Sequence, residues 1–183
     1  TIRPKRVIQS GERPLHALRE RGVEYVEVRL MDLDPFEPVG IQARTMRFLD
    51  VFLLHCLLSA SPIDTPQEIA ALGRNQQAVA QRGREPGLRL ERGERSVALA
   101  DWAAELLADM LPIAQRLDQV QGDTLNAQAV AHASQSLVLP DGLPSARVLQ
   151  TVQQEYAGAY VGFVKAQSAR IRQSMLDMPI DAG

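Results

Sequence analysis

The stretch Val23-Glu-Tyr-Val-Glu-Val-Arg-Leu-Met31 alternates apolar and polar residues and is the clearest predicted β-strand of this 183-residue chain. Successive side chains of a strand point to opposite faces of the sheet. The apolar face carries Val26, Val28 and Leu30, and the polar face carries Tyr25, Glu27 and Arg29. Antiparallel sheets commonly pack one face on a core and leave the other in water, so the polar face is either ordinary solvated surface or the floor of a polar site.

A second short strand is predicted at residues 2–8, which are basic and β-branched and can pair beside residues 23–31. Between them, residues 12–21 have a helical pattern with Pro14 in the first turn and Gly22 as a stop signal. Two strands alone are marginally stable. We therefore expect further strands to complete this sheet, and oligomerisation is one way to supply them.

Most of the chain after residue 40 is predicted to be helical. The strongest start signal is Thr65-Pro-Gln-Glu68, because Thr65 suits the N-cap, Pro66 the first position and Glu68 a capping box. The predicted helices span residues 42–59, 66–82, 100–119, 123–135 and 145–176, and residues 83–93 form a loop with a hairpin-like excursion. The expected fold class is α+β and mainly helical, with two or three short strands and five or six helices.

The predicted helix at residues 42–59 is apolar on nearly all sides, which is typical of a helix buried in a large core. It contains Cys56, the only cysteine of the chain, which excludes an internal disulfide. We expect a buried, inert thiol in a reducing cytoplasm. No apolar run is long enough to span a membrane, and residues 1–6 have no signal-peptide core.

The charge pattern and the histidines exclude several classes of site. The formal net charge is −2 and no basic stripe is present, so nucleic-acid binding and attraction to an acidic membrane have little support. The histidines lie on three different predicted helices without a Cys or carboxylate at ligand spacing, which argues against zinc. Asp32 and Asp34 follow the strand in a loop, where capping of the local backbone is a more common role than metal ligation.

Five segments together resemble the proteobacterial type of glutamate-cysteine ligase (γ-glutamylcysteine synthetase). The central one runs from Gly22 through Arg29 to Asp32-Leu-Asp-Pro-Phe36. The others are Ile2-Arg-Pro-Lys5, Arg47-Phe-Leu-Asp50, Gly83-Arg-Glu-Pro-Gly-Leu88 and Ser145-Ala-Arg-Val-Leu149, which occur in the family's order. Each motif alone is weak, but five in register are hard to obtain by chance.

The resemblance implies that the chain is the C-terminal part of a larger catalytic domain with a glutamine-synthetase-like antiparallel sheet. The missing N-terminal part would complete that sheet and hold most contacts to nucleotide and metal, so we expect the fragment alone to be inactive. Residues 1–40 would carry the site residues and residues 41–183 would be the helical region. The family reaction joins L-glutamate to L-cysteine with ATP, through a γ-glutamyl phosphate, as the first step of glutathione biosynthesis. We expect it to take place in the cytoplasm.

The resemblance also assigns roles to four residues. Glu27 would bind Mg²⁺, with Mn²⁺ as a possible substitute, and Arg29 would be catalytic and bind phosphate; Arg3 and Lys5 would bind phosphate or a substrate carboxylate. A carboxylate suits a hard cation, and an arginine two residues further along the strand points the same way and can bind phosphate oxygens bidentately.

Two alternatives to this function stay open. One is a mainly helical interaction module without catalysis, and the other is a different carboxylate-amine ligase of the same superfamily. Tyr25 is left outside the site because a half-buried strand tyrosine is commonly structural. Arg147 begins the last predicted helix, where its charge opposes the helix dipole, so we expect a partner for it elsewhere.

Overall fold

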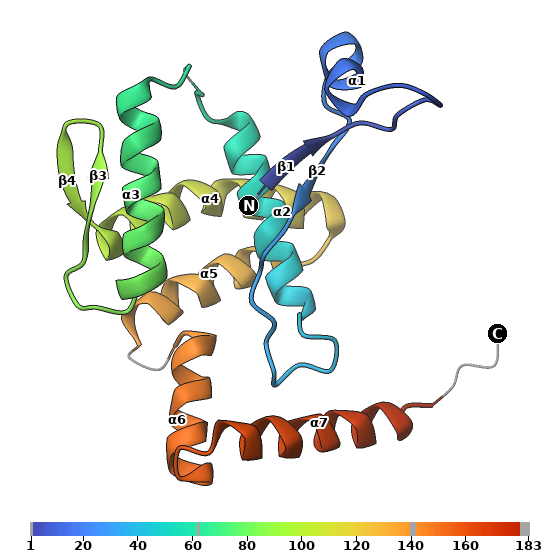
Figure 1. Cartoon of the computed structure of the whole chain (residues 1–183), viewed down its shortest axis with the longest axis vertical. Helices are drawn as coiled ribbons and strands as arrows, with labels where there is room; N and C mark the ends of the chain where they lie inside the picture. Colours follow the sequence, from blue (N-terminus) through green and yellow to red (C-terminus); the bar gives the residue numbers. More distant parts are fainter. Residues whose placement is uncertain (1, 62, 140–141, 180–183) are drawn as a thin grey trace. The chain divides into compact units, whose positions relative to one another are not determined.

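The structure is a computed structural model that describes residues 2–61, 63–139 and 142–179. These residues form seven α-helices and four β-strands (Figure 1). The mainly helical α+β class is therefore confirmed, although helices and strands are each one more than the predicted upper count. The chain divides into two compact units, Thr1–Asp34 and Pro35–Gly183. The functional division at residue 40 stays a prediction.

The first unit is a β-ribbon with one short helix. β1 (Ile2–Lys5) pairs antiparallel with β2 (Tyr25–Val28), and α1 (Pro14–Arg21) lies between them in the chain. Pro14 occupies the first turn of α1 and Gly22 ends it with φ 71°, a left-handed conformation that glycine adopts at little cost. The strand predicted at residues 23–31 is shorter than expected at both ends. Leu30, with φ 62°, breaks the extended backbone beyond its C-terminal end.

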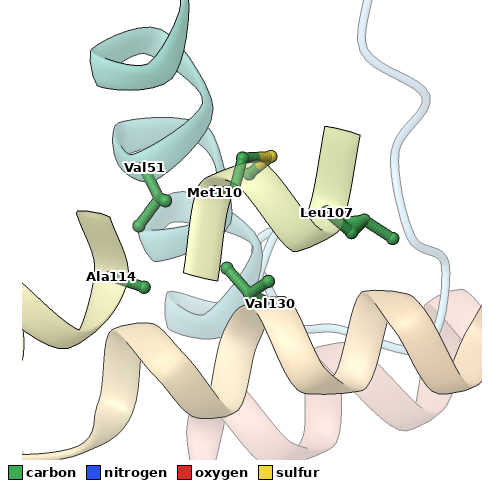
Figure 2. Packing of buried hydrophobic residues seen from close by; sticks show 5 residues of the cluster. All are labelled: Val51, Leu107, Met110, Ala114 and Val130. Atoms are coloured by element: carbon green, nitrogen blue, oxygen red, sulfur yellow. The ribbon is translucent and has the colours of Figure 1, made fainter. Parts of the chain in front are cut away.

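The core of the second unit is built by three helices, α2 (Ala43–Leu58), α4 (Leu99–Gln121) and α5 (Leu125–Val138). Their buried hydrophobic side chains form one cluster, which Figure 2 shows from close by. They are Val51, Leu107, Met110, Ala114 and Val130. None of these five buried residues is aromatic. Phe48 and Phe52 are partly buried and pack against the cluster. Figure 2 also shows that Val51, Met110 and Val130 come from three different helices.

A β-hairpin packs beside α3 (Pro66–Arg82). The predicted N-cap is confirmed, because Thr65 Oγ1 accepts a hydrogen bond from the Glu68 backbone N–H at 3.1 Å. The hairpin consists of β3 (Arg89–Arg92) and β4 (Arg95–Ala98), so its second strand lies beyond the predicted residues 83–93. Asn75 of α3 exchanges two hydrogen bonds with the backbone of Glu91, which fixes the hairpin against the helix.

The turn between α4 and α5 is closed by a buried carboxylate. Asp118 accepts hydrogen bonds from the backbone N–H groups of Asn126 and Ala127, each at 2.9 Å, and from the Asn126 side chain at 2.8 Å. These backbone groups belong to the first turn of α5, which has no intrahelical acceptors for them. Asp118 therefore caps α5 from the preceding helix.

The prediction of a single long helix at residues 145–176 is wrong. The structure has α6 (Pro144–Tyr156) and α7 (Tyr160–Leu176), which meet at a sharp bend (Figure 1). Ala157 and Gly158 both have positive φ, 49° and 83°, so the chain leaves the right-handed helix there. The bend brings Tyr156 and Tyr160 against the buried Phe163, with ring centroids 5.8 and 6.3 Å away.

Two predictions for residues 42–59 are also wrong. The helix is not buried all round, because only Val51 is fully buried while Met46, Leu57 and Leu58 are exposed. Cys56 is likewise exposed rather than buried. Partial burial nevertheless raises the pKa of its thiol, which disfavours the reactive thiolate. The sequence pattern described the apolar character of α2 correctly, but this chain does not supply enough structure to cover it.

Candidate functional site

The β1–β2 ribbon places the predicted site residues on one face. Arg3 lies opposite Glu27 in the register, and Lys5 lies opposite Tyr25. Opposite residues of an antiparallel pair share a face, as do residues two apart on one strand. The face therefore holds Arg3, Lys5, Tyr25 and Glu27, and Arg29 joins it just after the end of β2.

Glu27 is the centre of this face. Its Oε1 accepts a hydrogen bond from Arg29 Nε at 2.6 Å, and its Oε2 lies 3.1 Å from Lys5 Nζ. The hydrogen bond from Arg29, followed by that from Lys5, lowers the pKa of Glu27 below its ordinary value. The carboxylate is therefore ionised at neutral pH, with one cation on each oxygen.

Glu24 contacts a different group of residues. Its Oε2 accepts a hydrogen bond from the backbone N–H of Val7 at 3.1 Å and lies 3.7 Å from Arg6 Nε. Glu24 is three positions from Glu27, so the two side chains are expected on opposite sides of the ribbon. These separate partners make Glu24 a matched control for any role assigned to Glu27.

Arg3 and Tyr25 share the face without joining the Glu27 cluster. Although the Cα of Arg3 is paired with that of Glu27, Arg3 makes no ion pair with any residue in the described part of the chain. Tyr25 is exposed rather than half-buried. The structure thus brings Lys5, Glu27 and Arg29 together and leaves Arg3 as a nearby positive charge.

Glu27 suits a divalent cation as one ligand of a larger set. It is ionised, and carboxylate oxygens are the ligands that hard cations such as Mg²⁺ prefer. Residues 2–61, 63–139 and 142–179 contain no group of three His, Cys, Asp or Glu side chains that could hold a metal ion. Glu27 therefore fits Mg²⁺ only if further ligands come from outside these residues.

The Lys5–Glu27 ion pair is not predicted from the sequence, in which the family resemblance assigns Lys5 only to phosphate or a substrate carboxylate. The sequence predicts that residues 2–8 pair beside residues 23–31 but does not predict their register, and the register decides which charges meet. The predicted partner for Arg147 is found: its guanidinium carbon lies 3.7 Å from the centroid of the Phe36 ring. Phe36 in turn packs against Phe163, with the centroids of the two rings 5.9 Å apart.

The family model of glutamate-cysteine ligase matches residues 1–79, which include the whole ribbon. The chain is similar to part of a glutamate-cysteine ligase. The enzyme of Alcanivorax borkumensis is 42% identical over 160 residues, which are 87% of this chain and 30% of that protein. The enzyme of Janthinobacterium sp. (strain Marseille) is 48% identical, over 84% of this chain and 29% of its own length. The enzyme of Pseudomonas paraeruginosa is 42% identical and covers 100% of this chain and 34% of its own length.

A solved structure extends this likeness to the fold. The crystal structure of glutamate-cysteine ligase from Francisella tularensis in complex with AMP matches 99% of this chain with a TM-score of 0.86 and 34% identity. The chain covers 35% of that protein, and it spans about a third of the length of the curated relatives it matches. The resemblance inferred from the five motifs is thereby confirmed. Among the described residues, no helix is long and apolar enough to cross a membrane.

Proposed function

We propose that this chain is part of an ATP-dependent glutamate-cysteine ligase. The enzyme would phosphorylate the γ-carboxylate of L-glutamate, and the amine of L-cysteine would displace phosphate to give γ-glutamylcysteine, the first step of glutathione biosynthesis. The observation that supports this most strongly is the Lys5–Glu27–Arg29 cluster, which lies inside the segment that matches the ligase family. An ATP-consuming ligase suits the cytoplasm, and the one cysteine of these 183 residues, Cys56, is free.

The positive charges of the ribbon suit phosphoryl transfer. Three cationic side chains, Arg3, Lys5 and Arg29, share a face with one carboxylate, Glu27. Phosphoryl transfer spreads negative charge over the equatorial oxygens of the moving group, and fixed cations stabilise that charge. Arg29 is the proposed catalytic group because a guanidinium can bind phosphate oxygens bidentately. Arg3 and Lys5 would bind phosphate or a substrate carboxylate.

Glu27 would be the contribution of this chain to binding Mg²⁺, for which Mn²⁺ would substitute. When bound with ATP, Mg²⁺ neutralises charge on the phosphates and on the transferred group. The placement of Glu27 on a strand supports this role, since strand backbones hold side chains in a defined geometry. The remaining ligands would come from the part of the enzyme that lies outside this chain.

The rest of the enzyme is the proposed partner of this chain. The chain spans about a third of the length of its relatives, and apolar side chains are exposed on both units. In the ribbon they include Ile2 and Val26, and on α2 they include Met46, Leu57 and Leu58. Exposed apolar patches mark surfaces that another chain segment covers. We therefore expect the isolated 183 residues to bind hydrophobic dye or self-associate and to lack ligase activity.

The decisive experiment compares Glu27→Gln with Glu24→Gln in the full-length enzyme. Glu27→Gln keeps the size of the side chain but removes the charge that holds a hard cation, so kcat at saturating Mg·ATP should fall by about a hundredfold or more. Glu24→Gln should change kcat little, since its partners are Arg6 and Val7. The measurement is ATP-dependent formation of γ-glutamylcysteine, with thermal melts to confirm that both variants are folded.

Four outcomes would overturn parts of this proposal. Near-parental turnover of Glu27→Gln, or equal damage by Glu24→Gln, would return Glu27 to ordinary strand surface. Turnover with another amine in place of cysteine would favour a different ligase of the superfamily. A monomeric, cooperatively folding 183-residue chain without dye binding would favour an independent helical module.

A further inference from the structure

Lys5 forms an ion pair of a kind that is rare in this chain, between a lysine and a carboxylate. The sequence has 20 Lys and Arg residues, of which only Lys5 and Lys165 are lysines. Every other ion pair between described residues uses an arginine. Arginine presents a planar array of donors, whereas lysine presents a compact, strongly hydrated charge on a flexible stem. The one lysine-carboxylate pair among the described residues joins Lys5 to Glu27. A lysine is displaced from a carboxylate more easily than an arginine.

The geometry around Glu27 leaves no carboxylate oxygen without a cation. Arg29 occupies Oε1 at 2.6 Å, while Lys5 occupies Oε2 at the longer distance of 3.1 Å. A divalent ion that binds Glu27 must compete with at least one of these charges. Lys5 is the weaker competitor, because its contact is longer and it reaches Glu27 from the neighbouring strand.

We infer that Lys5 is an exchangeable cation that holds Glu27 in position until a divalent metal ion takes Oε2. Displaced from Glu27, the ammonium stays on the same face of the ribbon, where it can pair with an anionic phosphate. Lys5 thus acts as a positioning residue for Glu27 before the metal binds. This inference rests on the proposed function in one respect, namely that Glu27 is a metal ligand.

Competition predicts effects of opposite sign for two substitutions. Lys5→Gln removes the competing charge, so the metal should bind more tightly in the absence of nucleotide. Lys5→Arg supplies a cation that can grip both carboxylate oxygens, so the metal should bind more weakly. The side chains of Lys5 and Glu27 are 35% and 33% exposed, so solvent screens the pair. Each change in Kd is accordingly expected to be about three- to fivefold, the range of a partly exposed ion pair.

The test measures the Kd of Mn²⁺ alone for the full-length enzyme, by electron paramagnetic resonance of the free ion and by calorimetry. The parent is compared with Lys5→Gln, Lys5→Arg and the matched control Arg6→Gln. Arg6 carries the same charge just beyond the end of β1 but pairs with Glu24. Arg6→Gln should leave the Kd within about twofold of the parent, since its charge does not touch Glu27. Thermal melts check that each variant is folded.

Glu27→Gln separates failure of this inference from failure of the proposed metal site. If Glu27→Gln leaves Mn²⁺ binding unchanged, Glu27 is not a ligand and the proposed site falls together with the inference. If Glu27→Gln weakens binding but Lys5→Gln fails to tighten it, only the exchange role of Lys5 is overturned. The same conclusion follows if Arg6→Gln tightens binding as much as Lys5→Gln does, because the effect is then one of overall charge. The inference is supported if Lys5→Gln tightens binding, Lys5→Arg weakens it, and neither effect survives in the Glu27→Gln background.

Discussion

Glu27 in the ribbon and Asp118 in the helical unit are both held in the ionised form, but by different kinds of hydrogen-bond donor. Burial alone would raise the pKa of Asp118, but hydrogen bonds from the backbone of Ala127 and Asn126 and from the Asn126 side chain outweigh it and lower the pKa. Glu27 owes its lowered pKa to the side chains of Arg29 and Lys5. Backbone donors are fixed by the helix, whereas side-chain cations can move. The difference separates a carboxylate suited to structure from one suited to exchanging partners.

The largest effect on stability is expected in the helical unit, at Met110. Its side chain is 1% exposed and lies in the cluster formed by α2, α4 and α5. Met110→Ala leaves a cavity that the surrounding helices fill only in part, so the free energy of unfolding should fall by about 2–5 kcal/mol. Denaturant unfolding followed by circular dichroism measures the change.

The ribbon supplies the control for Met110. Val28 of β2 is only partly buried, so Val28→Ala in the same 183-residue chain should cost less than about 1 kcal/mol. Equal losses of unfolding free energy for Met110→Ala and Val28→Ala would contradict this prediction, because they would mean that Val28 is packed as tightly as Met110.

Arg29 should show the reverse behaviour, with a large effect on turnover and a small one on stability. A lysine at this position keeps the charge but cannot reproduce the planar pair of donors, so Arg29→Lys in the full-length enzyme should lower kcat by about a hundredfold. The melting temperature should change little, since the ion pair with Glu27 is solvent-exposed. Parental kcat with a lowered melting temperature would show instead that Arg29 serves the ribbon itself.

Asp118 should be important for stability and should make it pH-dependent. Asp118→Ala leaves the first N–H groups of α5 unsatisfied, at a cost of about 1–3 kcal/mol. Because the pKa of Asp118 is lower in the folded chain than in the unfolded chain, its contribution is complete above the ordinary Asp value of about 4 and is lost as the pH falls through the folded value.

The control for Asp118 is Asp109, an exposed carboxylate on the same helix. Asp109→Ala should change the free energy of unfolding by about 0.5 kcal/mol or less. Denaturant unfolding at pH 7 and at several values below pH 4 tests both points. If Asp118→Ala kept the same deficit at the lowest pH as at pH 7, the ionised state of Asp118 would not be the source of its effect.

The contrast between the two carboxylates explains what the sequence could and could not predict. Glu27 is singled out in the sequence because it stands in a periodic strand and in a family motif, both of which are local signals, and its role in metal binding stays a prediction. Asp118 was not found, because its partners lie eight and nine residues further along the chain, across a turn, and no local pattern marks them. Local signals also predicted the Thr65 cap and the end of α3 at Arg82 correctly.

The errors have a common physical origin in contacts beyond the local segment. The helical periodicity of residues 145–176 continues across Ala157 and Gly158, but packing of Tyr156 and Tyr160 around Phe163 favours a bend there. Burial of α2 and Cys56 was expected from composition, which reports that a segment is apolar but not whether this chain covers it. The register that joins Lys5 to Glu27 likewise depends on strand pairing.

The smallest predicted effect concerns Arg147, whose guanidinium lies 3.7 Å from the centroid of the Phe36 ring. A cation over an aromatic ring at an exposed site contributes about 0.5–1 kcal/mol. Arg147 also stands in the first turn of α6, where a positive charge is unfavourable by about 0.3–1 kcal/mol. Arg147→Gln removes both effects, so its net change in stability should be close to zero.

A double-mutant cycle isolates the favourable part. Unfolding free energies of the parent, Arg147→Gln, Phe36→Leu and the double variant give the coupling between the two side chains, because the dipole effect of Arg147 and the contact of Phe36 with Phe163 cancel in the cycle. We expect a coupling of about 0.5–1 kcal/mol, from the cation-aromatic contact. A coupling near zero, together with a gain in stability for Arg147→Gln alone, would mean that the contact with Phe36 does not offset the helix dipole. The partner that justifies this arginine would then have to be sought in the part of the enzyme outside the 183 residues.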